Sequence, residues 1–297
     1  MNAASSGGIR GGIGGGLGDG FGGGIFTGKR LRWFAAGIVL LNGFFPALWI
    51  LATAFKSELE LTAKPITWIP HQPTLNNFIA AFRDQPLPHY LLNSAIVALS
   101  AMVLSLFISA LAAYAIARLN LKYRGAILTS IIAVSMFPLV TLMVPLFEIM
   151  RGLGLLNSYW ALVLPYTVLN LPICTLVLVS FFQDIPRDLE NAAMIDGCTR
   201  LGALWRIVIP LAAPGVFTAG ILAFVNAWDE FLLALSFNSA AAYRTLPVGI
   251  QMYQGEFSFP WPTISAALVI AMIPVVVVIL IFQERVVSGL TSGGVKG

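Results

Sequence analysis

Six apolar stretches, each long enough to cross a lipid bilayer as a helix, dominate this sequence of 297 residues. They lie at residues 33–55, 90–116, 126–150, 159–182, 214–237 and 264–282. A helix needs ~20 predominantly apolar residues to span the hydrocarbon core. Only 10% of the residues are charged, whereas a soluble domain has ~25%. The sequence therefore predicts an all-α polytopic membrane protein with six transmembrane helices.

The basic residues are divided unevenly between the two sets of segments that flank these stretches. Six crossings place both termini on one side, and twelve Lys and Arg residues fall on that side against five on the other. The twelve are Arg10, Lys29, Arg30, Arg32, Arg118, Lys122, Arg124, Arg187, Arg200, Arg206, Arg285 and Lys296, and the five are Lys56, Lys64, Arg83, Arg151 and Arg244. Because positive charge accumulates on the inner side of membrane proteins, both termini are predicted to be cytoplasmic. The scattering of these residues argues against a nucleic-acid partner.

The first 28 residues differ in composition from the rest of the chain. They contain 13 of the 28 glycines and few large apolar side chains, so burial could not offset the entropy lost on ordering them. Residues 18–23 match GxGxxG, and residues 23–29 nearly match a Walker A loop, but no strand precedes either. We expect residues 1–28 to form a disordered cytoplasmic tail and residues 29–297 to form the transmembrane domain.

Residues 183–210, between the fourth and fifth apolar stretches, have the pattern of a helix-turn-helix. Pro186 and Asp188 suit the first turn of a short helix, and Gly197 suits its C-terminal cap. Thr199 can then cap a second helix, which Pro210 is expected to end. This second helix carries Leu201, Leu204, Trp205 and Val208 on one face. We expect nothing of the same chain to cover that face, so the segment should dock on another protein.

This segment resembles the cytoplasmic EAA loop of binding-protein-dependent ABC importer permeases. The family pattern is Glu-Ala-Ala, three residues, Gly, nine residues and Ile-x-Leu-Pro; here the aligned residues are Asn-Ala-Ala at 191–193, Gly197, and Ile-Val-Ile-Pro at 207–210. Asn191 replaces the glutamate often found in the family, and Ile209 replaces leucine. Further stretches at 112–119, 136–138, 227–235 and 282–297 resemble carbohydrate permeases of the maltose and trehalose type.

The resemblance implies a subunit of a bacterial inner-membrane sugar importer with no ATPase activity of its own. It implies three partners: a second permease subunit, a cytoplasmic ATPase dimer that binds ATP and Mg²⁺, and an extracytoplasmic sugar-binding protein. The substrate would be a disaccharide or oligosaccharide such as maltose or trehalose. The residues expected to contact the ATPase are Glu190, Asn191, Ala192, Ala193, Asp196, Gly197, Leu201, Leu204 and Trp205.

Two adjacent carboxylates, Asp229 and Glu230, fall inside the fifth apolar stretch, where burial of charge is costly. They could line the substrate path together with Tyr166, Asn170, Asn226 and Trp228, or they could form hydrogen bonds between helices. An alternative is an ion-coupled secondary transporter that uses Asp229 and Glu230 as relay groups. A third possibility, an intramembrane enzyme, would have only this pair as a catalytic constellation.

Metal, cofactor and disulfide chemistry has little support in the sequence. The two histidines, His71 and His89, have no ligand companions at useful spacing. The two cysteines are Cys174, within an apolar stretch, and Cys198, on the predicted cytoplasmic side. We therefore expect no metal, no bound cofactor and no disulfide in this chain.

Overall fold

The computed structural model describes residues 29–255 and 258–294, with side chains described for residues 33–255 and 258–282. The predicted tail, residues 1–28, lies outside the described residues. The chain divides into two units, Met1–Leu48 and Trp49–Gly297. The described part of the first unit belongs to α1 (Lys29–Ala54), which is apolar on all sides and continues into the second unit. Within the described residues every regular element is a helix.

Four helices are long and apolar enough to cross a membrane. They are α1 from Trp33, α4 (Leu87–Arg118), α7 (Trp160–Asp184), and α14 (Trp261–Gly294) as far as Phe282. Two bent helix pairs raise the number to six if each pair is one span. One pair is α5 (Arg124–Ser135) with α6 (Leu139–Gly152), bent by 92°, and the other joins residues Arg200–Leu211 to α11 (Ala213–Trp228), bent by 83°. The predicted all-helical membrane fold is confirmed.

The third and fifth predicted spans differ from continuous helices. The third breaks at Met136–Pro138, because Pro138 takes an extended conformation (φ −62°, ψ 130°) and a new helix begins after it. The fifth stops at Trp228, and α12 (Leu232–Phe237) begins after three residues. Asp229 and Glu230 therefore lie in a break between two helices and not inside a helix.

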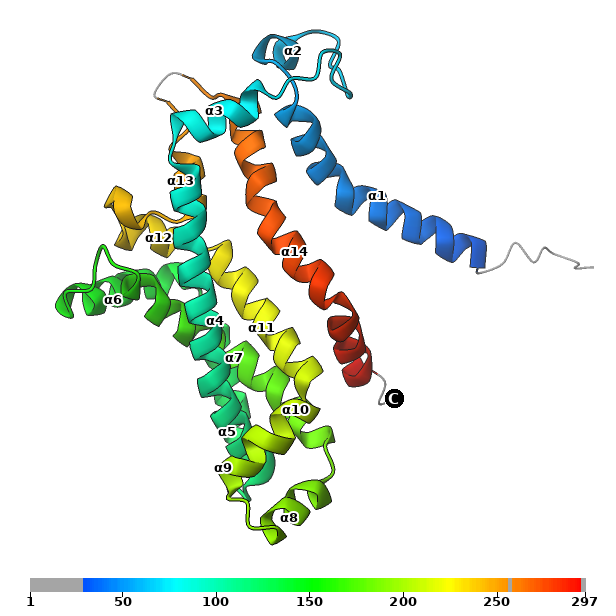
Figure 1. The fold of residues 1–297 in the computed structure, drawn as a ribbon, viewed down its shortest axis with the longest axis vertical. Helices are drawn as coiled ribbons and strands as arrows, with labels where there is room; N and C mark the ends of the chain where they lie inside the picture. Colours follow the sequence, from blue (N-terminus) through cyan, green and yellow to red (C-terminus); the bar gives the residue numbers. More distant parts are fainter. Residues whose placement is uncertain (1–28, 256–257, 295–297) are drawn as a thin grey trace, which may run out of the picture. The chain divides into compact units, whose positions relative to one another are not determined.

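The helices α4, α7 and α11 pack against one another in the second unit, and α14 packs on α11 (Figure 1). The hydroxyl of Ser105 on α4 donates to the carbonyl of Thr167 on α7 at 3.2 Å, and the Sγ of Cys174 on α7 lies 3.6 Å from the carbonyl of Ala219 on α11. Small residues permit this close approach, as expected in a membrane helix bundle. The buried side chains form two clusters, one near each end of α4.

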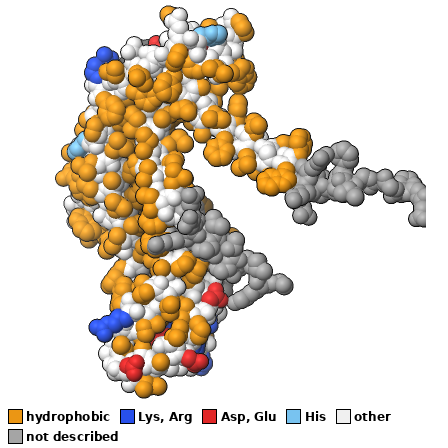
Figure 2. Space-filling model, turned by 45° about the vertical axis from the view of Figure 1, so that its right-hand side comes forward, with side chains coloured by type: hydrophobic (Ala, Val, Ile, Leu, Met, Phe, Trp, Pro, Cys, Tyr) orange, Lys and Arg blue, Asp and Glu red, His pale blue; other side chains and the backbone are white. Residues whose placement is uncertain are grey.

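The N-terminal end of α4 carries the shorter elements α3 (Asn76–Asp84) and α13 (Leu246–Gln251), while α8 (Arg187–Ile195) and α9 (Arg200–Ala203) lie at its C-terminal end (Figure 1). The remaining elements are α2 (Glu58–Thr62), η2 (Ala241–Tyr243), the π-helical turn η1 (Leu204–Val208) and α10 (Ile209–Leu211). On the face of the second unit in Figure 2, hydrophobic side chains cover the middle and charged side chains gather toward the ends. This distribution fits a bilayer around the middle of the bundle.

Candidate functional site

The helix-turn-helix begins with α8, which forms as its sequence predicts. Two acidic residues lie in its first turn, where they meet the positive end of the helix dipole. Gly197 follows the last turn with φ +91°, a left-handed conformation that favours glycine. The amides of Gly197 and Cys198 donate to the carbonyls of Met194 and Ala193 at 3.1 and 2.9 Å. These two bonds are the Schellman arrangement, and they fix the direction in which the chain leaves α8.

The second helix begins at the predicted cap and ends one residue after Pro210. The hydroxyl of Thr199 accepts a hydrogen bond from the amide of Gly202 at 3.1 Å, which caps α9. The chain then widens into the π-helical turn η1, in which the amide of Ile209 donates to the carbonyl of Leu204. The wider turn accommodates Pro210, which has no amide hydrogen, and the helix ends with α10. The helix thus ends at Leu211, one residue after Pro210, in agreement with the prediction.

The apolar face of this second helix is divided between the interior of the chain and its surface. Leu204 and Val208 are fully buried and belong to the hydrophobic cluster at this end of α4. Leu201 and Trp205 remain 57% and 43% exposed, and the Trp205 ring stacks on Phe107 of α4 at 5.8 Å. The expectation that the chain leaves this face uncovered is wrong for Leu204 and Val208, because α9 to α10 packs against the bundle.

A different set of apolar side chains is exposed on the helix-turn-helix. On α8, Leu189 is 46% exposed, Ala192 is exposed, and Ile195 is 86% exposed. These positions are three residues apart and form one stripe. Together with Leu201 and Trp205 they make up what we call the α8–α9 apolar surface. Sequence reasoning missed Leu189 and Ile195, although the three-residue spacing on α8 was the signal that could have identified them.

The other predicted contact residues on α8 fall on both sides of the helix. Asn191, Asp196 and Gly197 are exposed and available to a partner. Ala193 is buried against the chain itself. The structure therefore supports close approach of another protein at Gly197 but not at Ala193.

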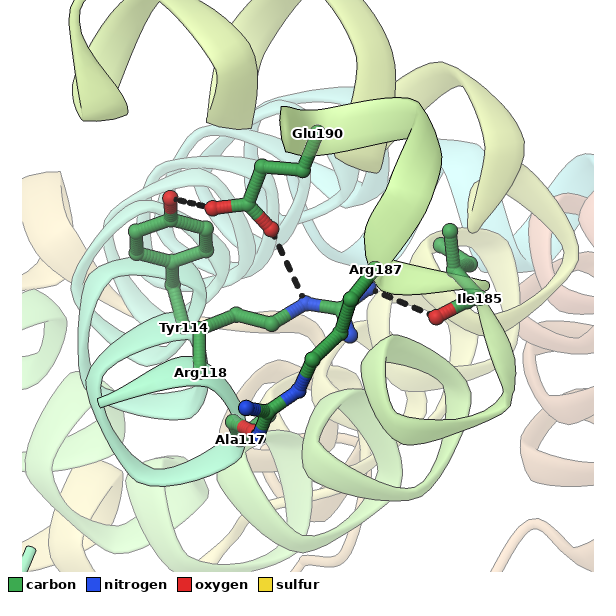
Figure 3. A network of polar contacts seen from close by, with 6 residues as sticks. All are labelled: Tyr114, Ala117, Arg118, Ile185, Arg187 and Glu190. Carbon is green, nitrogen blue, oxygen red and sulfur yellow. Dashed lines mark hydrogen bonds and ion pairs between the residues drawn. The ribbon is translucent and has the colours of Figure 1, made fainter. Parts of the chain in front are cut away.

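Glu190 points into the chain, which revises the expectation that it contacts the ATPase. Its side chain is 8% exposed and forms an ion pair with Arg118 of α4, whose Nε lies 3.1 Å from Oε2. The hydroxyl of Tyr114, one turn earlier on α4, donates to Oε1 of the same carboxylate (Figure 3). A buried carboxylate requires such partners, because an unpaired charge at this depth would be strongly destabilising.

Two arginine-to-carbonyl hydrogen bonds flank this ion pair. Nη2 of Arg118 donates to the carbonyl of Ile185 at 2.9 Å, at the junction of α7 and α8. Nη2 of Arg187, in the first turn of α8, donates to the carbonyl of Ala117 on α4 at 3.4 Å. Figure 3 shows the two guanidinium groups reaching in opposite directions between the helices. The end of α4 thus donates a hydrogen bond to the short connection that precedes α8, and the start of α8 donates one to α4.

A polar pocket of about 220 Å³ opens beside this network. It is lined by Arg118, Leu119, Asn120, Arg187, Glu190, Asn191, Met194 and Arg200. The lining contains three arginines and one carboxylate, so the pocket has an excess of positive charge.

The carboxylate of Glu230 accepts hydrogen bonds at the start of α12 and is not free to act in the bundle. Its Oε1 accepts the amide of Leu233 at 2.8 Å, and its Oε2 accepts the amide of Ala234 at 3.2 Å. The hydroxyl of Tyr166 on α7, which is buried, donates to the same carboxylate. Glu230 therefore caps α12 and ties it to α7.

Asn170 and Asn226 join α7 to α11. The side-chain amide of Asn170 is buried and donates to the carbonyl of Tyr166 at 2.9 Å and to that of Ala223 at 3.4 Å. The exposed side chain of Asn226 donates to Oδ1 of Asn170 at 3.1 Å. For Tyr166 and Asn170 the structure therefore favours hydrogen bonding between helices over contact with substrate.

Asp229 is the carboxylate of this group that remains exposed. It lies at one edge of a groove of about 500 Å³ between the end of α11, α13 and α14. The groove is otherwise apolar and is lined by Trp228, Leu246, Pro247, Ile250, Leu268, Ala271, Met272, Val275, Val276 and Ile279. Trp228 itself is 4% exposed and stacks on Phe224 at 5.4 Å, so its ring is packed inside the bundle. Of the six predicted substrate-path residues, Asn226 and Asp229 have exposed side chains.

Comparison with known proteins places this geometry in a family. Residues 105–292 match the family described as "Binding-protein-dependent transport system inner membrane component". The chain is 72% identical to the sulfoquinovosyl glycerol transport system permease protein SmoH of Agrobacterium fabrum, over 92% of this chain and 95% of that protein. It is 40% identical to the trehalose/maltose transport system permease protein MalG of Thermococcus litoralis, over 85% of this chain and 91% of that protein.

Two further matches extend the comparison. The trehalose transport system permease protein SugB of Mycobacterium tuberculosis is 39% identical over 91% of this chain and 99% of its own length. A solved bacterial ABC transporter that imports the polysaccharide alginate superposes with a TM-score of 0.75 at 21% identity, covering 86% of this chain and 95% of that one. This likeness shows the fold, while the sequence matches over most of the chain show the family. The chain belongs to the inner membrane components of binding-protein-dependent transport systems, as a permease subunit of a carbohydrate ABC importer.

Proposed function

We propose that this subunit forms half of the membrane path of an ATP-driven glycoside importer and that its α8–α9 apolar surface docks on a cytoplasmic ATPase. The observation that carries the proposal is this surface itself, with Ile195 86% and Leu201 57% exposed at the end of the bundle where charged side chains gather. Burying one large apolar side chain contributes ~1.5–3 kcal/mol, so a few such residues are enough to anchor a partner.

The remaining partners follow from the same proposal. A second permease subunit would complete the path, and an extracytoplasmic binding protein would deliver the glycoside at the opposite end of α4. ATP and Mg²⁺ would be bound by the ATPase, and this chain would bind no cofactor. The excess of basic residues on the α8–α9 side supports a cytoplasmic location for this end and for both termini in the inner membrane.

For the substrate we propose sulfoquinovosyl glycerol, the solute in the name of the relative that is 72% identical. The relatives named for trehalose or maltose are 39–40% identical. The proposed substrate is an anionic glycoside, in place of the neutral maltose or trehalose that the sequence resemblance suggests. The alternative of an ion-coupled carrier is not supported, because the family works with a binding protein and because the carboxylate of Glu230 caps a helix.

The docking proposal is tested by co-purification of the ATPase with Ile195→Asp. Aspartate at this position would introduce a charge into an apolar interface, so the ATPase should be lost while the subunit remains in the membrane. Leu59→Asp is the matched control, because Leu59 is 85% exposed on α2 at the other end of the second unit. Equal loss of the ATPase in both variants, or in neither, would contradict the proposed docking surface.

A further inference from the structure

The interior face of α8 is fastened to the C-terminal end of α4 by three side chains. Tyr114 and Arg118 are four residues apart on α4, so they lie on the same helix face, and both contact the carboxylate of Glu190 on α8. One side chain holds each carboxylate oxygen (Figure 3). Because the two α4 residues approach from one helix and the carboxylate from another, any relative movement of α4 and α8 would have to separate them.

We propose that Tyr114, Arg118 and Glu190 form a clamp that transmits displacement of α8 to α4. This inference rests on the proposed function, since α8 is displaced by the ATPase. It adds a pathway inside the subunit, whereas the docking proposal concerns only the outer surface of α8.

The two faces of α8 are suited to separate contacts, the outer face with the ATPase and the inner face with α4. Leu189 and Ile195 point outward with exposed side chains, while Glu190 and Ala193 are buried. A partner that pushes the outer face therefore acts on α4 through the inner face. The α8 helix follows α7 in the chain, and the clamp adds a direct link from α8 to α4.

The surrounding bonds make the junction rigid. Arg118 also donates to the carbonyl of Ile185 at 2.9 Å, and Arg187 donates to the carbonyl of Ala117 at 3.4 Å. With the two contacts to Glu190, four polar contacts therefore join the end of α4 to α8 and to the short connection before it. The charged side chains of the clamp are 5% and 8% exposed. Separating a buried ion pair costs more free energy than allosteric coupling usually involves, so the clamp should stay closed while α8 and α4 move together.

Because α4 is long, movement at the clamp would be transmitted over a large distance. The helix has 32 residues, from Leu87 to Arg118, and at a rise of 1.5 Å per residue it extends ~48 Å. Its other end carries Tyr90, which belongs to the buried hydrophobic cluster near α13, and the buried Asn93. Movement of its C-terminal turn would therefore reach the opposite end of the bundle.

The first test uses the complete importer with its binding protein in proteoliposomes. Glu190→Gln keeps the size of the side chain but removes the charge, and Tyr114→Phe removes one hydroxyl. We expect the stimulation of ATP hydrolysis by the loaded binding protein to fall about fivefold or more in each variant. Co-purification of the ATPase and its unstimulated hydrolysis should stay at the wild-type level, which a merely misfolded subunit would not allow. Asp188→Asn is the matched control, since Asp188 is an exposed carboxylate on the same helix.

The second test replaces the clamp with a covalent bridge between α4 and α8. Cysteines replace Tyr114 and Glu190 in a chain with Cys174→Ala and Cys198→Ser, and a short bifunctional thiosulfonate bridges them. If the clamp stays closed during transport, the bridged pair should recover transport that the unbridged pair has lost.

The outcomes separate the clamp from the docking proposal. The clamp is overturned if the two single variants stimulate as wild type does, if they lose the ATPase together with stimulation, or if the bridge blocks transport. A wild-type complex that brings no ATPase would instead contradict the proposed function, and this result appears before any variant is made.

Discussion

Carboxylates in this chain serve different purposes according to what surrounds them. Glu190 is buried and held by Arg118 and Tyr114, whereas Glu230 caps α12 through two amides. Asp229, the neighbour of Glu230, is exposed at the edge of a groove. A carboxylate with several donors is fixed in place, so among these residues Asp229 is the acceptor that a solute could still reach.

At the residue scale, Gly197→Ala should loosen the end of α8. The residue has φ +91°, where a Cβ costs ~1–2 kcal/mol. Hydrogen exchange of the Cys198 amide, which closes the cap on Ala193, should accelerate in the variant. Gly197→Asn should be milder, because asparagine tolerates the left-handed region better. Unchanged exchange in Gly197→Ala would show that the cap does not hold α8.

Glu60 gives a pH-dependent prediction outside the membrane-spanning helices. Its carboxylate accepts the amide of His71 at 2.8 Å and the hydroxyl of Thr67 at 3.0 Å. The His71 amide is the main cause that lowers the pKa of Glu60, and Thr67 and the charges of His71 and Lys56 lower it further against a desolvation effect that raises it. A lowered pKa in the fold means that this contribution is complete above the ordinary value of 4.5 and is lost as the pH falls through the lower value.

The measurement for Glu60 is protease sensitivity of the loop between α2 and α3 as a function of pH. Cleavage should increase on acidification in the wild type, and Glu60→Gln should make it nearly independent of pH in that range. A wild-type profile as flat as that of the variant would contradict the assigned hydrogen bonds.

Individual residues also mark where sequence reasoning succeeds. Gly197 and Thr199 act through local backbone geometry, so their capping roles were predictable. The inward orientation of Glu190 was not predictable, because its partner Arg118 lies 72 positions earlier in the sequence and only the tertiary packing brings the two together.

At the scale of elements, the bundle depends on breaks as much as on helices. The 92° bend between α5 and α6 follows from Pro138, and the 83° bend before α11 follows the π-helical turn and Pro210. Prolines at 46, 145, 165, 172 and 274 lie inside their helices. A proline therefore does not by itself predict a break, since neighbouring helices can satisfy the carbonyl that it leaves free.

Packing of α11 on α7 should be sensitive to Gly215→Ala. A Cβ at Gly215 would lie 2.3 Å from Cγ of Phe181, closer than atoms can approach, so the ring or a helix must shift. Overpacking of this kind costs ~1–3 kcal/mol, and the thermal stability of the purified subunit in detergent should fall. Gly152→Ala on α6 is the control, because nothing lies within 4 Å of its Cβ position. Recovery of stability when Phe181→Leu is added would identify the clash; equal stability of the two alanine variants would contradict it.

At the scale of the whole chain, the number and positions of the apolar stretches were predictable from the sequence. The four long helices and the two bent pairs correspond to six candidate crossings. The end of α11 at Trp228 and the break that contains Asp229 were not predictable. Hydropathy does not distinguish one continuous span from a helix that is followed by a second, short helix. The identity of the solute could not be predicted from the motifs, since the EAA-type segment, which we propose to dock on the ATPase, carries no information about the solute.

The most direct test of the account is uptake of sulfoquinovosyl glycerol by the complete importer in proteoliposomes, with ATP inside and ion gradients collapsed by ionophores. We predict that uptake requires ATP and the binding protein, persists without ion gradients, and is lost in Ile195→Asp. Uptake that continues without ATP and stops when the gradients collapse would contradict the account.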